Sequence, residues 1–239
     1  MVKPAAVAVL LVSVSLSWGC RSREDVRVDD SRSHVEATTP GPLAAKTAKT
    51  ASTATRPRIV ALGDSLTAGL GLDAASAYPS LLQTRLAAEG FNYEVINAGV
   101  SGDTSAGGLS RLDWALDGDV RVLIVALGGN DALRALPPDE LKQNLATIIE
   151  RAQARHIMVI LAGMEAPPNF GRDYVVKFHR VYPELASRYR LAFVPFLLAG
   201  VAGSETLNQR DGIHPTADGA KIVAENIWTA LRPIVATHP

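Results

Sequence analysis

From residue 57 onward the sequence alternates between short apolar runs and longer amphipathic segments, and this alternation constrains the possible fold most strongly. Short runs rich in Val, Ile and Leu are typical of strands that are covered on both faces. The apolar runs lie at residues 58–62, 93–99, 120–129, 157–163 and 191–196. Because strands that alternate with helices form parallel sheets through right-handed crossovers, the pattern predicts a flavodoxin-like three-layer α/β/α domain with a five-stranded parallel sheet over residues 57–239.

The segments between and after these runs have the apolar spacing and the end signals of helices. We expect helices at residues 77–90, 105–118, 138–155, 173–190 and 216–235. Gly90 is placed to end the first of them and Pro138 to begin the third, because glycine adopts the left-handed turn after a helix and proline fits its first turn. Pro183 is expected to interrupt the fourth, since proline lacks the N–H that a helix interior needs.

The N-terminal region differs in composition from the domain that follows. Residues 1–20 have the pattern of a secretory signal, in which Lys3 supplies a positive charge and an apolar stretch follows. The chain's single cysteine, Cys20, resembles the lipidated cysteine of bacterial lipoproteins, although Ser17 stands where that pattern prefers leucine. An ordinary cleaved signal is the alternative. Residues 21–56 are charged and then rich in Ala, Thr, Ser and Lys, a composition that predicts a disordered tether.

A lipid anchor followed by a tether predicts a protein of the cell envelope. Arg21 after the cysteine resembles the sorting signal for the outer membrane, and without lipidation we expect a periplasmic or secreted protein. The 24 acidic and 24 basic side chains give a formal net charge of zero, which argues against nucleic-acid partners. One cysteine cannot build an internal disulfide framework. We expect a monomer with no cofactor and no metal.

Three polar segments containing glycine follow the first three predicted strands, and a fourth lies in the loop beyond the last strand. They are Gly-Asp-Ser-Leu at 63–66, Ser-Gly-Asp-Thr at 101–104, Gly-Gly-Asn-Asp at 128–131 and Asp-Gly-Ile-His-Pro at 211–215. Because the carboxyl ends of parallel strands meet at one edge of a sheet, and binding sites lie there, we expect these four segments to come together.

Ser65 is a candidate nucleophile, and it needs a base and an orienting acid within reach. Of the five histidines, only His214 lies in a loop at the predicted site edge. Asp211 stands three residues before it, so that one turn relieved by Gly212 can carry both, with Pro215 opening the next helix. The structural alternatives are that Ser65 caps a helix and that Asp211 and His214 belong to a polar turn.

Attack on an acyl carbon places negative charge on the carbonyl oxygen, and N–H donors stabilise it. Gly102, whose backbone no side chain shields, and the side-chain amide of Asn130 are candidate donors, together with the Ser65 backbone N–H. Asn130 is alternatively a simple turn residue. The neighbouring carboxylates are interpreted as cap or turn residues; they are Asp64, Asp103 and Asp131.

These segments, in this order, resemble the four blocks of the SGNH (GDSL) hydrolase superfamily. Residues 97–112, 127–136, 167–174 and 211–215 are similar to its bacterial branch of arylesterases, acyl-CoA thioesterases I and lysophospholipases L1. The resemblance implies the α/β/α fold, a catalytic triad, no metal, and hydrolysis of esters or thioesters. It carries over to the residues already singled out: Ser65, Asp211 and His214 as the triad, and Ser65, Gly102 and Asn130 as the oxyanion hole.

Two other classes of protein remain open. A metal-dependent phosphoesterase could use the same polar side chains as ligands, and a non-catalytic lipoprotein could bind lipid or glycan. For the esterase, we expect small-molecule substrates: aryl esters, short-to-medium acyl esters and lysophospholipids, with acyl thioesters secondary. Pro168 and Phe170 are the candidate substrate-binding residues, Phe170 as an apolar wall for an acyl chain or, alternatively, as a residue that packs its loop onto the domain.

Overall fold

The computed structural model describes residues 56–237. The expectations for the signal segment, for Cys20 and for residues 21–55 concern the part of the chain outside this range. Among residues 56–237, no helix is long and apolar enough to span a bilayer.

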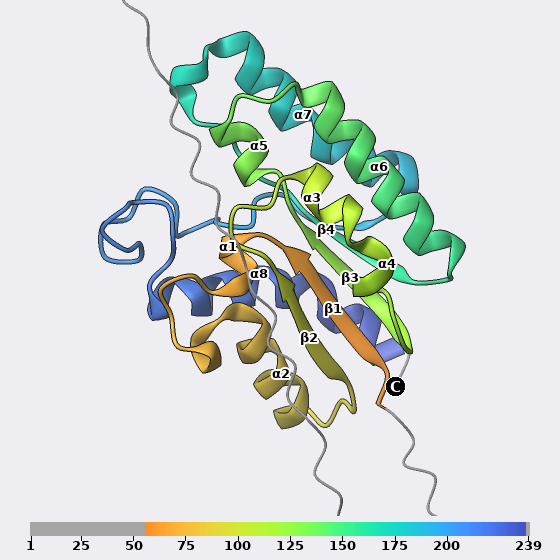
Figure 1. Ribbon diagram of the computed structural model, residues 1–239. Coiled ribbons are helices and arrows are strands. Elements are labelled where there is room, and N and C mark those ends of the chain that lie inside the picture. Colours follow the sequence, from red (N-terminus) through yellow and green to blue (C-terminus); the bar gives the residue numbers. More distant parts are fainter. Residues whose placement is uncertain (1–55, 238–239) are drawn as a thin grey trace, which may run out of the picture. The chain divides into compact units, whose positions relative to one another are not determined.

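A five-stranded sheet forms the centre of the domain (Figure 1), and all its pairings are parallel. The strands are β1 (Arg58–Gly63), β2 (Glu94–Gly99), β3 (Val120–Ala126), β4 (Met158–Ala162) and β5 (Ala192–Val194). Their order is β2-β1-β3-β4-β5. The chain therefore reverses its direction across the sheet after β2, and the predicted flavodoxin-like architecture is confirmed.

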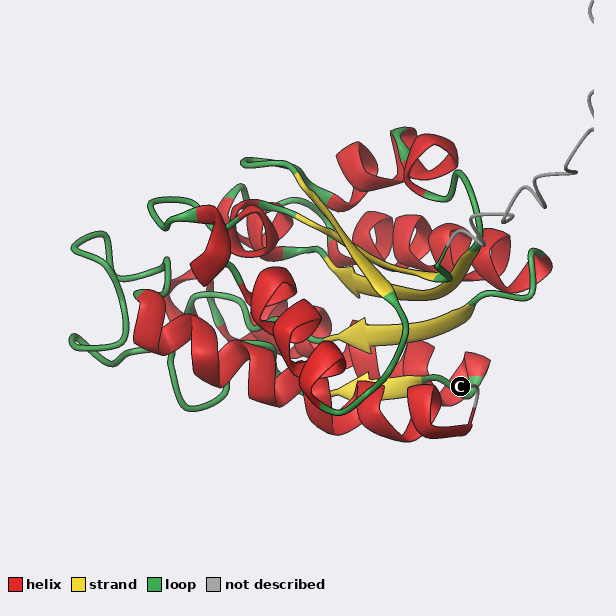
Figure 2. Cartoon of the chain, turned by 90° about the horizontal axis from the view of Figure 1, so that it is seen from below, coloured by secondary structure: helices red, strands yellow, loops and turns green. Residues whose placement is uncertain are grey.

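Helices cover both faces of this sheet, as Figure 2 shows along its edge. They are α1 (Ser65–Ala68), α2 (Tyr78–Ala88), α3 (Ser105–Ser110), α4 (Leu112–Ala115), α5 (Gly129–Leu133), α6 (Pro138–Ala154), α7 (Arg172–Tyr189) and α8 (Ala217–Thr237). Helix α2 contacts α8, whereas α6 contacts α3 and α7. Right-handed crossovers place these two groups on opposite faces, so the three layers follow from the strand order.

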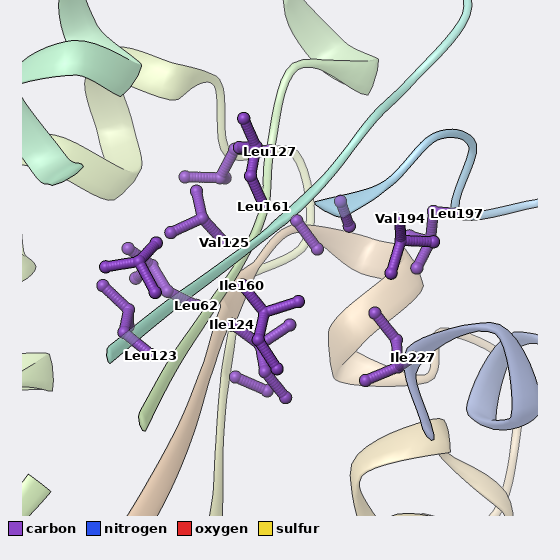
Figure 3. Packing of buried hydrophobic residues seen from close by; sticks show 14 of the residues in the cluster. Leu62, Leu123, Ile124, Val125, Leu127, Ile160, Leu161, Val194, Leu197 and Ile227 are labelled. Carbon is purple, nitrogen blue, oxygen red and sulfur yellow. The ribbon is translucent and has the colours of Figure 1, made fainter. Parts of the chain in front are cut away.

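Strand β3 is the middle strand of the sheet, and Figure 3 shows its residues Leu123, Ile124 and Val125 among the buried side chains of the core. Four consecutive residues of β3, from Val122 to Val125, have no exposed surface, which requires cover on both faces of the sheet. Helix α6 buries one stripe at helical spacing, formed by Leu141, Leu145, Ile148, Ile149 and Ala152. Its amphipathic pattern explains why this helix matches the predicted range closely.

Three expected elements differ from the structure. The helix expected at 105–118 is broken into α3 and α4 at Arg111, whose φ of −106° leaves the helical region and whose guanidinium donates to Gly63 O and Ala98 O. Helix α7 is not interrupted at Pro183, because its buried face continues past that residue. Strand β5 is shorter than expected, since Pro195 follows it and has no N–H for the ladder.

Candidate active site

The four polar segments come together at the carboxyl edge of the sheet, around a cavity of about 570 Å³. Each segment contributes to its wall: Ser65 from the end of β1, Gly102 from the loop after β2, Asn130 from the turn after β3, and His214 from the loop beyond β5. The expectation that parallel topology would collect these segments is therefore met.

Ser65 is the first residue of α1, directly after β1 and the capping residue Asp64. The Asp64 Oδ1 atom accepts the Leu66 N–H at 3.0 Å, and Gly69 ends this short helix in the left-handed conformation. Asp64, not Ser65, is therefore the helix cap, and the structural alternative for Ser65 is wrong. Its hydroxyl is left to face the loop that carries His214.

Ser65, His214 and Asp211 are joined in series by side-chain hydrogen bonds. The distance from Ser65 Oγ to His214 Nε2 is 2.8 Å, and that from His214 Nδ1 to Asp211 Oδ2 is 2.7 Å. The hydrogen bond from His214, followed by the backbone N–H groups of His214 and Ile213, lowers the pKa of Asp211 to about 2. An ionised Asp211 accepts the Nδ1 hydrogen, so that in the neutral ring Nε2 accepts a hydrogen bond from Ser65.

The turn from Asp211 to His214 is compact because the carboxylate also binds its own backbone. Asp211 Oδ1 accepts the N–H groups of Ile213 and His214, both at 3.0 Å, and Gly212 has a φ of +76°. This is the turn that the spacing predicted. Pro215, however, does not open the next helix: α8 begins at Ala217, and Pro215 forms an isolated bridge with Asn208.

Gln209 ties this turn to the segment that follows Ser65, a role that the sequence did not indicate. Its side-chain amide donates to Leu70 O at 2.7 Å and to Pro215 O at 2.9 Å. Its backbone N–H donates to His214 O at 2.7 Å. These contacts hold the two halves of the site, which lie about 150 residues apart in sequence, against each other.

Asn130 is held by two acceptors at the wall of the cavity. Its Nδ2 donates to Asp103 O at 2.9 Å and to Asp64 Oδ2 at 3.2 Å. Gly102 lines the same cavity with a φ of +85°, a conformation that favours glycine. The structure thus brings Ser65, Gly102 and Asn130 to one cavity.

The neighbouring carboxylates have separate structural partners. Asp103 pairs with Arg111 Nε at 2.6 Å. Asp131 is buried and accepts both the backbone N–H and the hydroxyl of Ser105, at 2.8 and 2.5 Å. The interpretation of Asp131 as a cap residue agrees with this contact, because Asp131 accepts the N–H of the first residue of α3, next to the N-cap residue Thr104. Within residues 56–237, no group of three or more His, Cys, Asp or Glu side chains is arranged to hold a metal ion.

Asp64 is a buried carboxyl group whose pKa is raised. Desolvation is the main cause, and it lifts the pKa from 3.8 to about 6 against the opposing effects of the Leu66 N–H, His214 and the Asn130 amide. In the unfolded chain this burial is absent. Between pH 3.8 and 6 the folded state therefore binds more protons at this position than the unfolded state does.

We expect this difference to appear in the pH dependence of stability. The contribution of Asp64 is fully present below about pH 4 and is lost as the pH rises through about 6, a change of roughly 3 kcal/mol for a shift of this size. Asp64→Asn keeps a helix-capping residue and removes the titration. Urea unfolding from pH 3.5 to 7 should show the stability of the wild type falling relative to that of the variant. A constant difference between the two would contradict the raised pKa.

The rest of the cavity wall is largely aliphatic and comes from loops far apart in sequence. Its apolar residues include Leu66, Leu70, Leu133, Met164, Pro168, Phe196 and Ile213. Pro168 thus lies where it was expected. Phe170 does not line the cavity: its ring packs on Tyr174, with 5.7 Å between centroids, which favours the packing alternative. Leu66, Leu70, Phe196 and Ile213 were not singled out from the sequence, because single apolar residues near strand ends and in loops carry no local signal for a pocket.

A serine–histidine–aspartate series at the carboxyl edge of a parallel α/β/α sheet is an arrangement that serine hydrolases use. Residues 61–222 match the model of the GDSL-like Lipase/Acylhydrolase family, and the chain belongs to that family. It is accordingly a carboxylic ester hydrolase, which agrees with the activity that the resemblance in sequence implied.

Relatives that are named esterases or thioesterases, and a solved structure, agree with this assignment. The chain is 46% identical to "Esterase TesA" of Pseudomonas aeruginosa over 178 residues, which is 74% of this chain and 89% of that protein. It is 36% identical to "Thioesterase 1/protease 1/lysophospholipase L1" of Escherichia coli K12, over 74% of this chain and 84% of that one. A crystal structure of TesA superposes with a TM-score of 0.71 at 45% identity, over 74% and 98% of the two chains.

Proposed function

We propose that the protein hydrolyses carboxylic esters through an acyl-enzyme on Ser65, with His214 as general base and Asp211 as the residue that orients it. The observation that carries this proposal is the hydrogen-bonded series of the three side chains at the wall of a largely apolar cavity. A serine is a weak nucleophile by itself, and an adjacent imidazole held by a carboxylate activates it.

The reaction has two balanced halves. Ser65 Oγ attacks the ester carbonyl carbon while His214 Nε2 takes the hydroxyl proton, and the collapse of the tetrahedral intermediate releases the alcohol, which receives that proton. Water then attacks the acyl-enzyme with the same proton transfers and releases the carboxylic acid. The N–H groups of Ser65 and Gly102 and the Asn130 amide stabilise the oxyanion.

A serine-directed fluorophosphonate tests this assignment. We expect stoichiometric labelling, loss of esterase activity in proportion to labelling, and mapping of the modification to Ser65. Activity that survives complete labelling, or that a chelator abolishes, would favour the metal-dependent alternative. Labelling of another serine would contradict the assignment of the nucleophile.

The cavity favours uncharged acyl groups. Its ionisable lining residues are Asp64, Glu165 and His214, and no Lys or Arg among the described residues lines it. We therefore assign aryl and short-to-medium acyl esters, and lysophospholipids, as substrates. Thioesters of coenzyme A are secondary, because the wall offers no cation to their phosphates.

We expect kcat/KM for p-nitrophenyl esters to rise about two- to fourfold per added methylene until the cavity is filled, since each buried methylene contributes about 0.8 kcal/mol at most. Leu133→Ala should shift the preferred chain length, because Leu133 lines the cavity. Phe170→Ala is the matched control and should leave it unchanged. A preference for acyl-CoA over every simple ester would overturn the substrate ranking.

The location in the cell is also a proposal. We infer a monomer of the cell envelope, tethered at the outer membrane through a lipid on Cys20. On Triton X-114 phase separation of cells that express the full chain, the protein should enter the detergent phase, and Cys20→Ser should move it to the aqueous phase. An aqueous wild-type protein would contradict the anchor and favour a periplasmic or secreted enzyme.

A further inference from the structure

One short helix, α5, is bonded to the loop that carries Gly102. The Asn130 amide donates to Asp103 O at 2.9 Å. The buried carboxylate of Asp131 accepts the N–H of Ser105 at 2.8 Å and its hydroxyl at 2.5 Å. Two adjacent residues of α5 therefore hold two points of the loop that follows Gly102.

Arg134, the C-terminal cap of α5, supplies a third bond to the same loop. Its Nη2 donates to Gly102 O at 2.8 Å. The same nitrogen lies 3.8 Å from the point that a Cβ on Gly102 would occupy, so the guanidinium lies alongside this residue. Arg134 is exposed, in contrast to Asp131. We call these three residues, Asn130, Asp131 and Arg134, the α5 clamp.

We propose that Arg134 is a positioning residue for the oxyanion hole, and this inference rests on the proposed function. A glycine at positive φ has the greatest backbone freedom of any residue, and the turn around Gly102 has in addition the Asp103 N–H to Val100 O bond at 3.1 Å. The charge-assisted bond from Arg134 restrains the peptide that follows Gly102. It thereby fixes the direction of the Gly102 N–H relative to the Asn130 amide.

The Asp131 and Arg134 contacts differ in burial, and this separates the expected effects of losing each of them. The Asp131–Ser105 contact lies in the interior, where an unpaired carboxylate would destabilise the fold. The Arg134 bond lies at the surface, where such bonds contribute little to global stability. Oxyanion donors act through their preorganised placement, so a loosened Gly102 affects the transition state more than substrate binding. Loss of the Arg134 side chain should therefore reduce kcat and leave the fold intact.

The experiment compares Arg134→Ala, Arg134→Lys and, as a matched surface control, Arg121→Ala, whose arginine pairs with Asp119 at a distance from the cavity. For Arg134→Ala we expect kcat to fall about tenfold while KM changes less than twofold and the melting temperature stays within about 2 °C. The lysine variant should recover part of kcat. Guanidinium chloride at tens of millimolar should raise kcat of Arg134→Ala and not that of the wild type.

The possible failures are distinguishable. If the wild type hydrolyses esters and is labelled at Ser65, but Arg134→Ala keeps kcat within twofold, the positioning role is wrong and the proposed function stands. A kcat that falls only in step with the folded fraction, without rescue by lysine or guanidinium, also overturns it. If the wild type is neither active nor labelled at Ser65, the proposed function fails, and this inference fails with it.

Discussion

Ser65→Ala should lower kcat for ester hydrolysis by about 10⁴- to 10⁶-fold and leave the fold intact. The Ser65 hydroxyl is hydrogen-bonded to His214 Nε2 at 2.8 Å, and alanine, which has no hydroxyl, cannot form the acyl-enzyme. Helix α1 keeps its cap, because Asp64 rather than Ser65 accepts the Leu66 N–H. The measurement is the steady-state rate with p-nitrophenyl butyrate, corrected by active-site titration for traces of active enzyme.

Ser101→Ala is the matched control for this variant. Ser101 lines the same cavity but has no part in the hydrogen-bonded series, so its loss should change kcat by no more than a few-fold. Circular dichroism and the melting temperature should agree among the three proteins. If Ser65→Ala retains more than a tenth of the wild-type activity, Ser65 is not the nucleophile.

The second large effect is expected for Asn130→Ala, which should reduce kcat by about 10²- to 10³-fold with little change in KM. In the free enzyme the Asn130 amide donates to Asp103 O and, over a longer distance, to Asp64 Oδ2. We expect the hydrogen directed at Asp64 to turn to the oxyanion, whose charge develops only in the transition state. Because the gain arises at that stage, the loss should appear in kcat.

Asn144→Ala separates this effect from a general loosening of the polar network. Asn144 donates to Ser105 Oγ at 3.0 Å and does not line the cavity, so the variant should keep kcat close to that of the wild type. A change confined to KM in Asn130→Ala would make Asn130 a substrate-binding residue. Equal losses in both variants would indicate that the network, and not the donor, is responsible.

Much of the fold follows from the sequence because local pattern and topology agree. Strand β3 and helix α6 were predicted within a few residues, since a continuous apolar run and an amphipathic stripe are features of the local chain. The expectation that Pro183 interrupts the helix was wrong, because the packing of the buried face of α7 stabilises the helix by more than one missing hydrogen bond destabilises it. The break at Arg111 was missed because its acceptors belong to β1 and β2, far away in sequence.

Some contacts of the candidate site were likewise predictable from the sequence, whereas others were not. Asp211 and His214 are three residues apart, so a single turn decides their contact, and parallel topology brings the strand ends to one edge; the sequence by itself determined both. Only the tertiary structure decided that Asp131 binds Ser105, that Gln209 joins the His214 turn to Leu70, and that Phe170 packs outside the cavity. The physical reason is that these contacts join loops whose relative positions depend on the packing of the whole domain, and no local periodicity records them.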